Sequence, residues 1–204
     1  MNRLSCFSIA ALLALDAFLV YKYVTVVRAD AENSAVLLQE LSEQTPILTN
    51  FTFMLDNAGF RLADIPVVCE ERNVPLLSLF PDSSEWLFVY RFSEHHCESC
   101  IEYGLDLLKS QTDSSDANVL LLGEYTNNRI FKRLIGELGV GGYHVGNSGR
   151  LDLPAEEYSY PYYLVLNKDG IVSCVYVPSK DQYVTDSTNL RRILGRYLCP
   201  QISE

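Results

Sequence analysis

From Trp86 to the C-terminal end, the chain alternates between apolar runs of strand length and amphipathic stretches of helical spacing. Three runs are typical of buried strands, namely residues 86–92, 119–122 and 162–166. Three stretches carry apolar side chains at one-turn spacing and begin near Cys97, Thr126 and Asp186 or Ser187. This alternation predicts an α/β domain with helices packed on a sheet.

Turn signals divide the second half of this region. Asn167-Lys168-Asp169-Gly170 lies between the apolar run 162–166 and the strand-like residues 171–177, which predicts a β-hairpin. Residues 141–158 are rich in glycine and polar side chains, so a long excursion without regular structure is expected there.

The pattern between Phe51 and Phe80 is broken into shorter pieces. Residues 51–55, 65–69 and 74–80 each have strand-like composition, and Asp56 to Gly59 has the composition of a turn. These signals predict a hairpin-like entry to the sheet.

The N-terminal segment is dominated by an apolar run from Leu4 to Val20 that contains one charge, Asp16. A spanning helix needs roughly 20 residues, so residues 1–27 are interpreted as a membrane anchor. A cleaved signal peptide is the alternative, with a small-residue motif at residues 29–31. Residues 28–48 are then a juxtamembrane helix or linker, with helical spacing over 31–44, and residues 49–204 form the folded domain.

Composition and charge restrict the classes of function. The 204-residue chain is 48% hydrophobic, which is sufficient for one domain with a substantial core. Its net charge of −10 and the absence of a Lys/Arg cluster argue against nucleic-acid binding.

The candidate chemistry lies in Cys97 and Cys100, which follow a buried strand at the predicted start of a helix. The free N–H groups and positive dipole end of a helix N-terminus stabilise a thiolate, and the second sulfur lies within one turn. A dithiol for thiol–disulfide exchange is therefore favoured. An inert disulfide is one alternative. A zinc site is another, although only His95, His96 and His144 could complete it.

Four further cysteines are present, one of them, Cys6, in the apolar N-terminal run. The others are Cys69, Cys174 and Cys199. They allow one structural disulfide plus a free thiol, or three buried thiols that act as small apolar side chains.

The order of strand, CxxC motif, helix, strand, helix, proline, hairpin and closing helix resembles the thioredoxin fold, over about residues 86–198. The resemblance is to membrane-anchored, thioredoxin-like proteins of the bacterial envelope, including the cytochrome-maturation type and the AhpC/TSA-like group. It implies a central mixed β-sheet flanked by helices. It also implies that Cys97 is the nucleophile, that Cys100 resolves the mixed disulfide, and that the Tyr160–Pro161 bond is cis.

Within this resemblance, Tyr160, Pro161 and His96 are the residues expected to contact substrate. Four positions depart from the usual pattern. His96 replaces an aromatic residue, Glu98-Ser99 form the interior of the motif, and Arg91 stands where many thioredoxins carry a buried acid. The group that transfers protons is therefore not assigned by the sequence.

The function expected is that of a thiol–disulfide oxidoreductase acting on protein thiols and disulfides, tethered to the bacterial inner membrane and facing the periplasm. A reductant is favoured, because the charge of Glu98 opposes strong thiolate stabilisation at Cys97. No cofactor or metal is implied, and the upstream redox partner is not identified. The alternatives are a copper(I) chaperone using the two cysteines with His95, His96 or His144, and a redox-inactive interaction module.

Overall fold

The computed structural model describes residues 18–25, 27–28, 48–82, 84–112 and 118–198. The chain divides into two units, Met1–Leu48 and Thr49–Glu204. In the first unit, residues 18–25 and 27–28 are helical. Within the described ranges, no helix combines the length and the apolar character needed to cross a bilayer. Most of the predicted anchor and the predicted helix over 31–44 lie outside these ranges, and both stay predictions.

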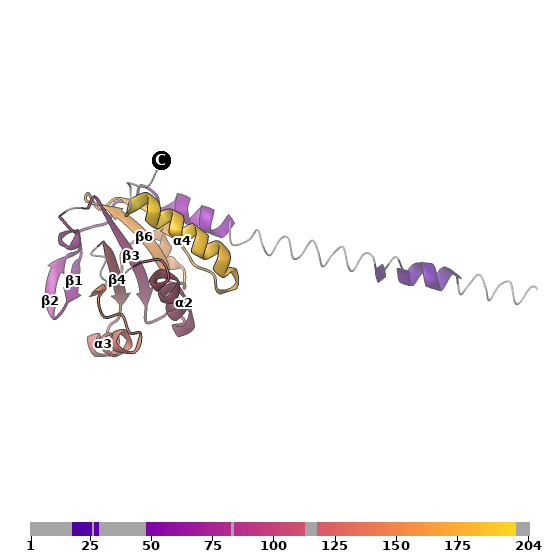
Figure 1. Cartoon of the computed structure of the whole chain (residues 1–204), viewed down its shortest axis with the longest axis horizontal. Helices are drawn as coiled ribbons and strands as arrows, with labels where there is room; N and C mark the ends of the chain where they lie inside the picture. The colour runs from indigo at the N-terminus through magenta and orange to yellow at the C-terminus, as the bar shows by residue number, and fades with distance from the viewer. Residues whose placement is uncertain (1–17, 26, 29–47, 83, 113–117, 199–204) are drawn as a thin grey trace, which may run out of the picture. The chain divides into compact units, whose positions relative to one another are not determined.

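A single mixed sheet forms the centre of the second unit (Figure 1). Its strands are β1 (Pro66–Cys69), β2 (Arg72–Pro75), β3 (Trp86–Ser93), β4 (Val119–Glu124), β5 (His144–Ser148), β6 (Tyr162–Asn167) and β7 (Val172–Tyr176). They lie in the order β2-β1-β5-β4-β3-β6-β7. Strands β3, β4 and β5 are parallel, and the remaining neighbours pair antiparallel. The predicted α/β architecture and the β6–β7 hairpin are confirmed.

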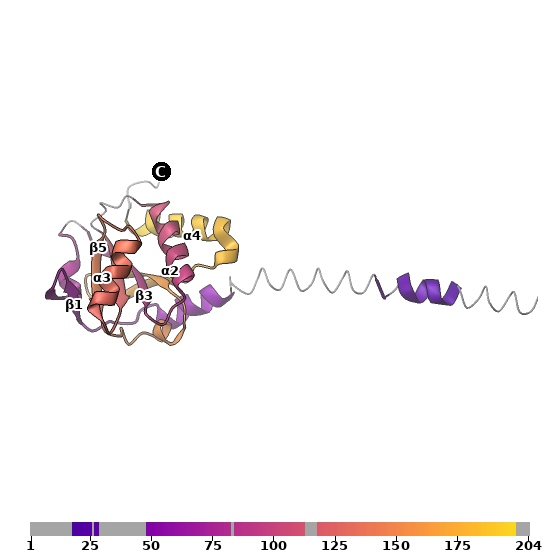
Figure 2. The same cartoon turned by 90° about the horizontal axis from the view of Figure 1, so that it is seen from below.

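The α-helices are α2 (Glu98–Lys109), α3 (Asn128–Glu137) and α4 (Tyr183–Tyr197). Short 3-10 helices are η1 (Leu76–Leu79), η2 (Pro154–Glu157) and η3 (Lys180–Gln182), and residues 49–57 are also helical. Figure 1 and Figure 2 both show α2 and α4 side by side.

Strand β3 alternates between the two faces of the sheet, and each face has its own core. Phe88, Tyr90 and Phe92 point to the face covered by α2, α3 and α4. Leu87 and Val89 point to the other face, where residues 49–57 and the 3-10 helices η1 and η2 pack. A strand buried on both sides is expected at the centre of such a sheet, which explains its continuous apolar run.

Tyrosine hydroxyls fix α2 on the sheet. Tyr90 donates to the Ile101 carbonyl at 2.8 Å, and Tyr163 donates to the Gly104 carbonyl at 2.6 Å. Both rings are almost fully buried, and the Tyr90 ring lies directly against the Gly104 backbone. Glycine at 104 therefore allows the helix that carries the dithiol to approach β3 closely.

The prediction of a strand at residues 51–55 is wrong, because this segment is helical. Its inward face consists of Asn50, Phe53, Met54 and Asn57, which follow helical spacing, whereas Phe51 is 55% exposed. Asn50 pairs with both backbone groups of Val177. A helix whose inward face is half polar lacks the apolar periodicity that sequence analysis uses.

Other boundaries also differ from the predictions. The expected strand over 74–80 is the end of β2 followed by η1, and the 141–158 excursion contains both β5 and η2. Asn127, not Thr126, caps α3 by accepting from the Arg129 N–H at 2.9 Å. Helix α4 begins at Tyr183, so Asp186 lies inside its first turn.

Replacing Gly104 by alanine should destabilise the domain by about 1–3 kcal/mol, because the new methyl group meets the buried Tyr90 ring. Gly136→Ala is the matched control. Gly136 lies in α3 with open space at its Cβ position, so that substitution should stabilise the protein by about 0.5–1 kcal/mol. Urea denaturation of the full chain measures both changes, and equal effects of the two substitutions would contradict this packing.

Candidate active site

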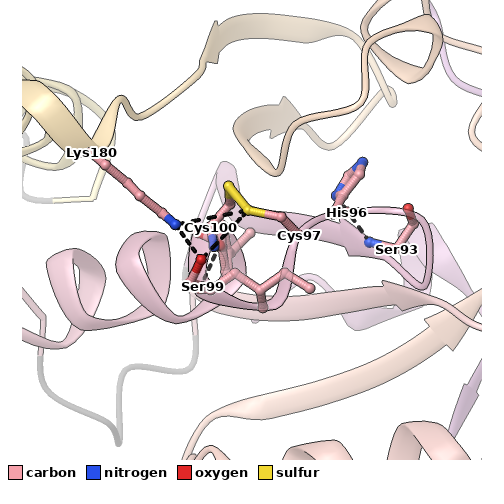
Figure 3. The surroundings of a disulfide bond; sticks show 8 residues. Ser93, His96, Cys97, Ser99, Cys100 and Lys180 are labelled. Atoms are coloured by element: carbon pink, nitrogen blue, oxygen red, sulfur yellow. Dashed lines mark hydrogen bonds between the residues drawn. A yellow bond between two sulfur atoms is a disulfide. The ribbon is translucent and has the colours of Figure 1, made fainter.

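The dithiol lies immediately beyond the carboxyl end of β3, where Cys97 is the N-cap of α2. Cys97 and Cys100 are joined in a disulfide (Figure 3). The Cys97 sulfur accepts from the Cys100 N–H at 3.1 Å, so it sits on the free donors of the helix N-terminus. Cys97 is exposed and Cys100 is partly buried, which makes Cys97 the accessible sulfur. The predicted helix start is confirmed.

Lys180 is a functional candidate that sequence reasoning missed. Its ammonium lies 3.8 Å from the Cys97 sulfur and donates to the Ser99 hydroxyl (Figure 3). The Ser99 hydroxyl is itself 3.8 Å from the same sulfur. A cation at this distance favours the thiolate form of Cys97 after reduction.

The loop that carries Lys180 is held by Asp186 of α4. This carboxylate is 1% exposed and accepts from the Ser179 N–H at 2.7 Å. It also accepts from the hydroxyls of Tyr103 and Tyr176. Because Ser179 directly precedes Lys180, these contacts fix the backbone from which the ammonium reaches Cys97.

His96 lies on the other side of the disulfide (Figure 3). Its Nδ1 accepts from the Ser93 N–H at 3.1 Å, within a tight turn that links β3 to α2. Burial lowers the pKa of His96 to about 4; the charge of Glu156 opposes this shift, and the charges of Arg91 and His95 add to it. His96 is therefore neutral near pH 7, so it does not contribute a cation beside Cys97.

Arg91, in β3, is the centre of a buried ion network below this turn. The guanidinium is 1% exposed and contacts Glu156 through Nε at 2.8 Å and Nη2 at 3.1 Å. Glu124 accepts from Nη2 at 3.0 Å. Three further hydrogen bonds go to the Gly123 carbonyl, the Ser148 hydroxyl and the Gly149 carbonyl. The position that holds a buried acid in many thioredoxins is thus occupied by Arg91, whose guanidinium forms ion pairs with two carboxylates.

The two carboxylates respond differently to this environment. Burial would raise the pKa of Glu156, but hydrogen bonds and charge from Arg91 and a hydrogen bond from Tyr162 lower it overall. The pKa of Glu124 is raised, mainly by burial and also by the nearby Glu156 charge, against the influence of Arg91. Negative charge is therefore held more firmly at Glu156 than at Glu124.

A polar cleft of about 300 Å³ lies over this network and extends to the dithiol turn. Its lining comes from Arg91, Ser93, His95, His96, Glu124, Arg150, Glu156, Glu157, Tyr158, Ser159 and Tyr162. The carboxyl ends of β3, β4 and β5 meet at this edge of the sheet, where open α/β folds bind their ligands.

Pro161 and Tyr160 lie at the same edge of the sheet as the dithiol. Tyr162 pairs with Arg91, which places Pro161 beside the carboxyl end of β3. The predicted cis bond before Pro161 is wrong, since no cis peptide bond occurs among the described residues. Trans is the favoured isomer of such bonds, by about 0.5–1 kcal/mol. Pro161 is buried and Tyr160 is 57% exposed, so of the two only Tyr160 presents its side chain to solvent.

Cys69, Cys174 and His144 are separate from this site, and Cys6 and Cys199 fall outside the described residues. Cys69 and Cys174 are unpaired, and burial raises the pKa of both, to about 11 for Cys174. His144 pairs with Leu120 at the beginning of β4, at the opposite end of the parallel strands from the dithiol. The described residues contain no group of three or more metal-ligating side chains. His144 therefore does not join the two cysteines, as one version of the copper alternative required.

Comparisons with known proteins support the fold. No protein-family model matches the chain, and no curated protein matches it. Among solved structures, it is similar to a proposed protein disulfide isomerase from Bacteroides thetaiotaomicron, with TM-score 0.50 and 13% identity over 70% of this chain and 94% of that one. It is also similar to a proposed thiol:disulfide interchange protein DsbE from Chlorobium tepidum, with TM-score 0.51 and 11% identity over 68% and 96% of the two chains.

These likenesses, together with the sheet order, show that the chain has a thioredoxin-like fold. The Cys97–Cys100 disulfide joins the N-cap of α2 to its first turn, just after the interior strand β3. The fold predicted from the sequence resemblance is confirmed.

Lys180→Gln should raise the pKa of the Cys97 thiol in the reduced protein, because it removes the cation beside the sulfur. The rate of alkylation by iodoacetamide at pH 7 should fall by roughly three- to tenfold. Lys168→Gln is the control, because Lys168 lies in the β6–β7 turn at the other end of the sheet. Identical pH profiles for the two variants would contradict a role for Lys180.

The low pKa of His96 predicts a pH dependence of stability. Between its ordinary value of 6.5 and about 4, the unfolded chain binds a proton at His96 that the folded chain does not. The free energy of unfolding should therefore fall as pH decreases through this range, and should fall less in His96→Gln. Urea titrations of both proteins at several pH values between 7 and 4 measure the difference, and parallel curves would show that His96 is not buried in its neutral form.

Proposed function

We propose that the protein is a thiol–disulfide oxidoreductase that acts on protein disulfides through Cys97 and Cys100. The observation that carries this proposal is the position of Cys97. Its sulfur is exposed, capped onto the N-terminus of α2, within 3.8 Å of the Lys180 ammonium and bonded to a second cysteine one turn away. This arrangement favours thiolate chemistry at one sulfur and gives a second sulfur that can resolve the intermediate.

In the reducing direction, the Cys97 thiolate attacks a substrate disulfide and forms a mixed disulfide, releasing one substrate thiolate. Cys100 then loses its proton and attacks the Cys97 sulfur, which releases the second substrate thiolate and closes the Cys97–Cys100 bond. The two protons of the dithiol end on the two substrate thiols. A dithiol donor must then reduce the protein, and this reaction needs no prosthetic group.

We propose reduction as the working direction. A strongly oxidising pair requires a very stable thiolate in the reduced state. The helix N-terminus and Lys180 favour the thiolate, but Glu98 is adjacent to Cys97 in the chain and Glu94 lies in the preceding turn. The negative charge of these two residues opposes the thiolate and limits the oxidising power of the disulfide.

We also propose that residues 1–27 anchor the protein in a bacterial inner membrane, with the dithiol domain in the periplasm. The apolar run from Leu4 to Val20 supports an anchor, and a compartment that permits disulfides suits the exchange chemistry. Protease protection in spheroplasts tests the location. Resistance of the domain to added protease would contradict it.

The full chain should catalyse insulin reduction by dithiothreitol, and Cys97→Ser should lower that rate at least about 100-fold, because the attacking sulfur is lost. Cys100→Ser should accumulate a mixed disulfide with substrate, visible by mass spectrometry. Cys69→Ser is the control and should retain activity, since this thiol lies outside the site. Insulin reduction that survives Cys97→Ser would contradict the proposal, and a wild-type protein without turnover would instead be a redox-inactive interaction module.

A further inference from the structure

Charged side chains of both signs line the cleft beside the dithiol. Those at its floor are buried, whereas those at its rim are exposed to solvent. The inference drawn from it rests on the proposed function. The floor is formed by Arg91 and Glu156, whose side chains are 1% and 4% exposed. Arg91 directs all its donor nitrogens to partners within the protein, and Glu156 accepts from Arg91 and from Tyr162. The floor is therefore satisfied internally and offers no free charge to a ligand.

The rim is different. Arg150 and Glu157 both line the cleft, and their side chains are 52% and 77% exposed. They approach each other only to 4.0 Å, through one pair of atoms. Exposed pairs of this kind contribute little to stability, with measured values of about 0–1 kcal/mol. A ligand with two opposite charges can therefore replace this ion pair with little loss of folding free energy.

The two rim groups match the two ends of an amino acid. A guanidinium can bind a carboxylate with two parallel hydrogen bonds, and the Glu157 carboxylate can accept from an ammonium group. Glu124, 32% exposed, adds a second carboxylate to the same cleft. The volume of about 300 Å³ is at the lower limit for ligand pockets, which suits a small molecule.

The cleft adjoins the turn that carries the dithiol. Its lining includes Ser93, His95 and His96, and His96 directly precedes Cys97 in the chain. Figure 3 shows His96 and Lys180 on opposite sides of the disulfide, and of these two residues only His96 lines the cleft. His96 is neutral near pH 7 and does not compete with Arg150 for a carboxylate.

We propose that this cleft makes small zwitterionic disulfides of the cystine type a second substrate class, with Arg150 binding the carboxylate and Glu157 the ammonium group. The Cys97 thiolate attacks one sulfur of cystine, and a first cysteine leaves as its thiolate. Cys100 loses its proton and attacks Cys97, which releases the second cysteine. Cystine is reduced to two cysteines, the dithiol is oxidised to the disulfide, and the two thiol protons end on the products. A dithiol such as dithiothreitol reduces the protein again.

Four small disulfides test the contributions of Arg150 and Glu157 separately, because they differ in which charged groups they carry. Cystine carries both groups, cystamine only ammonium groups, 3,3′-dithiodipropionate only carboxylates, and 2-hydroxyethyl disulfide neither. Arg150→Gln should raise KM roughly three- to tenfold for cystine and dithiodipropionate, and Glu157→Gln should do so for cystine and cystamine. Neither variant should change the reduction of 2-hydroxyethyl disulfide. Comparing each variant with the wild-type chain removes differences in the intrinsic reactivity of the four disulfides.

Arg133→Gln and Glu137→Gln are the matched controls. These two residues form an exposed ion pair on α3, 3.7 Å apart, and neither of them lines the cleft. Both should leave all four KM values unchanged. Equal effects of Arg150→Gln on all four disulfides, or an effect on insulin without one on cystine, would overturn the zwitterion site. If insulin is reduced but no charge dependence is found, the proposal fails while the proposed function stands. If no disulfide is reduced at all, the proposed function fails with it.

Discussion

The buried guanidinium of Arg91 is the interaction on which the rest of the site depends. From β3 it binds the end of β4 through Gly123 and Glu124, the end of β5 through Ser148 and Gly149, and η2 through Glu156. An unpaired charge at this depth is strongly unfavourable, and loss of one partner of a buried pair costs about 3–5 kcal/mol. The network therefore holds together four chain segments that end at one edge of the sheet.

This constraint explains the composition of the site. A protein with many apolar strands could fill this edge with further apolar side chains. Replacing buried ion pairs by apolar side chains often leaves the stability of a protein unchanged or increases it. In this chain the edge is polar and hollow, and the charge of Arg91 in its floor is matched by the charge of Glu156. The hydroxyl of Tyr162 donates to Glu156, which also accepts from Arg91, so this carboxylate has hydrogen-bond partners within the protein. A polar floor that is internally satisfied leaves the rim residues to interact with ligands.

Much of the fold could be predicted from local sequence signals. The continuous apolar run of β3, the helical spacing after Cys97 and the Asn-Lys-Asp-Gly turn before β7 each reflect burial or turn chemistry that acts over a few residues. The strand predicted over residues 51–55 is part of a helix whose inward face includes Asn50 and Asn57, and the side-chain amides of these two residues pair with distant backbone groups. A polar residue satisfied by tertiary contacts resembles a surface residue in sequence.

The site could be predicted only in part, because some of its residues are close in sequence and others are brought together by tertiary contacts. The two cysteines and the helix that begins at them are adjacent in sequence, so their arrangement follows from local rules. Lys180 and Glu156 reach the site from 83 and 65 residues away, and no spacing in the sequence relates them to Cys97 or Arg91. The only signal for Lys180 was a basic residue in the loop before the last helix.

The two sides of the disulfide are therefore built by different parts of the chain. Lys180 and its support from Asp186 come from the segment after β7 and adjust the stability of the Cys97 thiolate. Arg150, Glu156 and Glu157 come from the segment between β5 and β6 and shape the cleft on the His96 side. Among the described residues, Lys180 and Asp186 form no hydrogen bond or ion pair with Arg150, Glu156 or Glu157. Under the proposed function, a change in one group therefore alters the reactivity of Cys97 without altering substrate binding. Under the proposed function, a dithiol fixed at the start of α2 keeps its chemistry while the segment before Pro161 determines which substrate is bound.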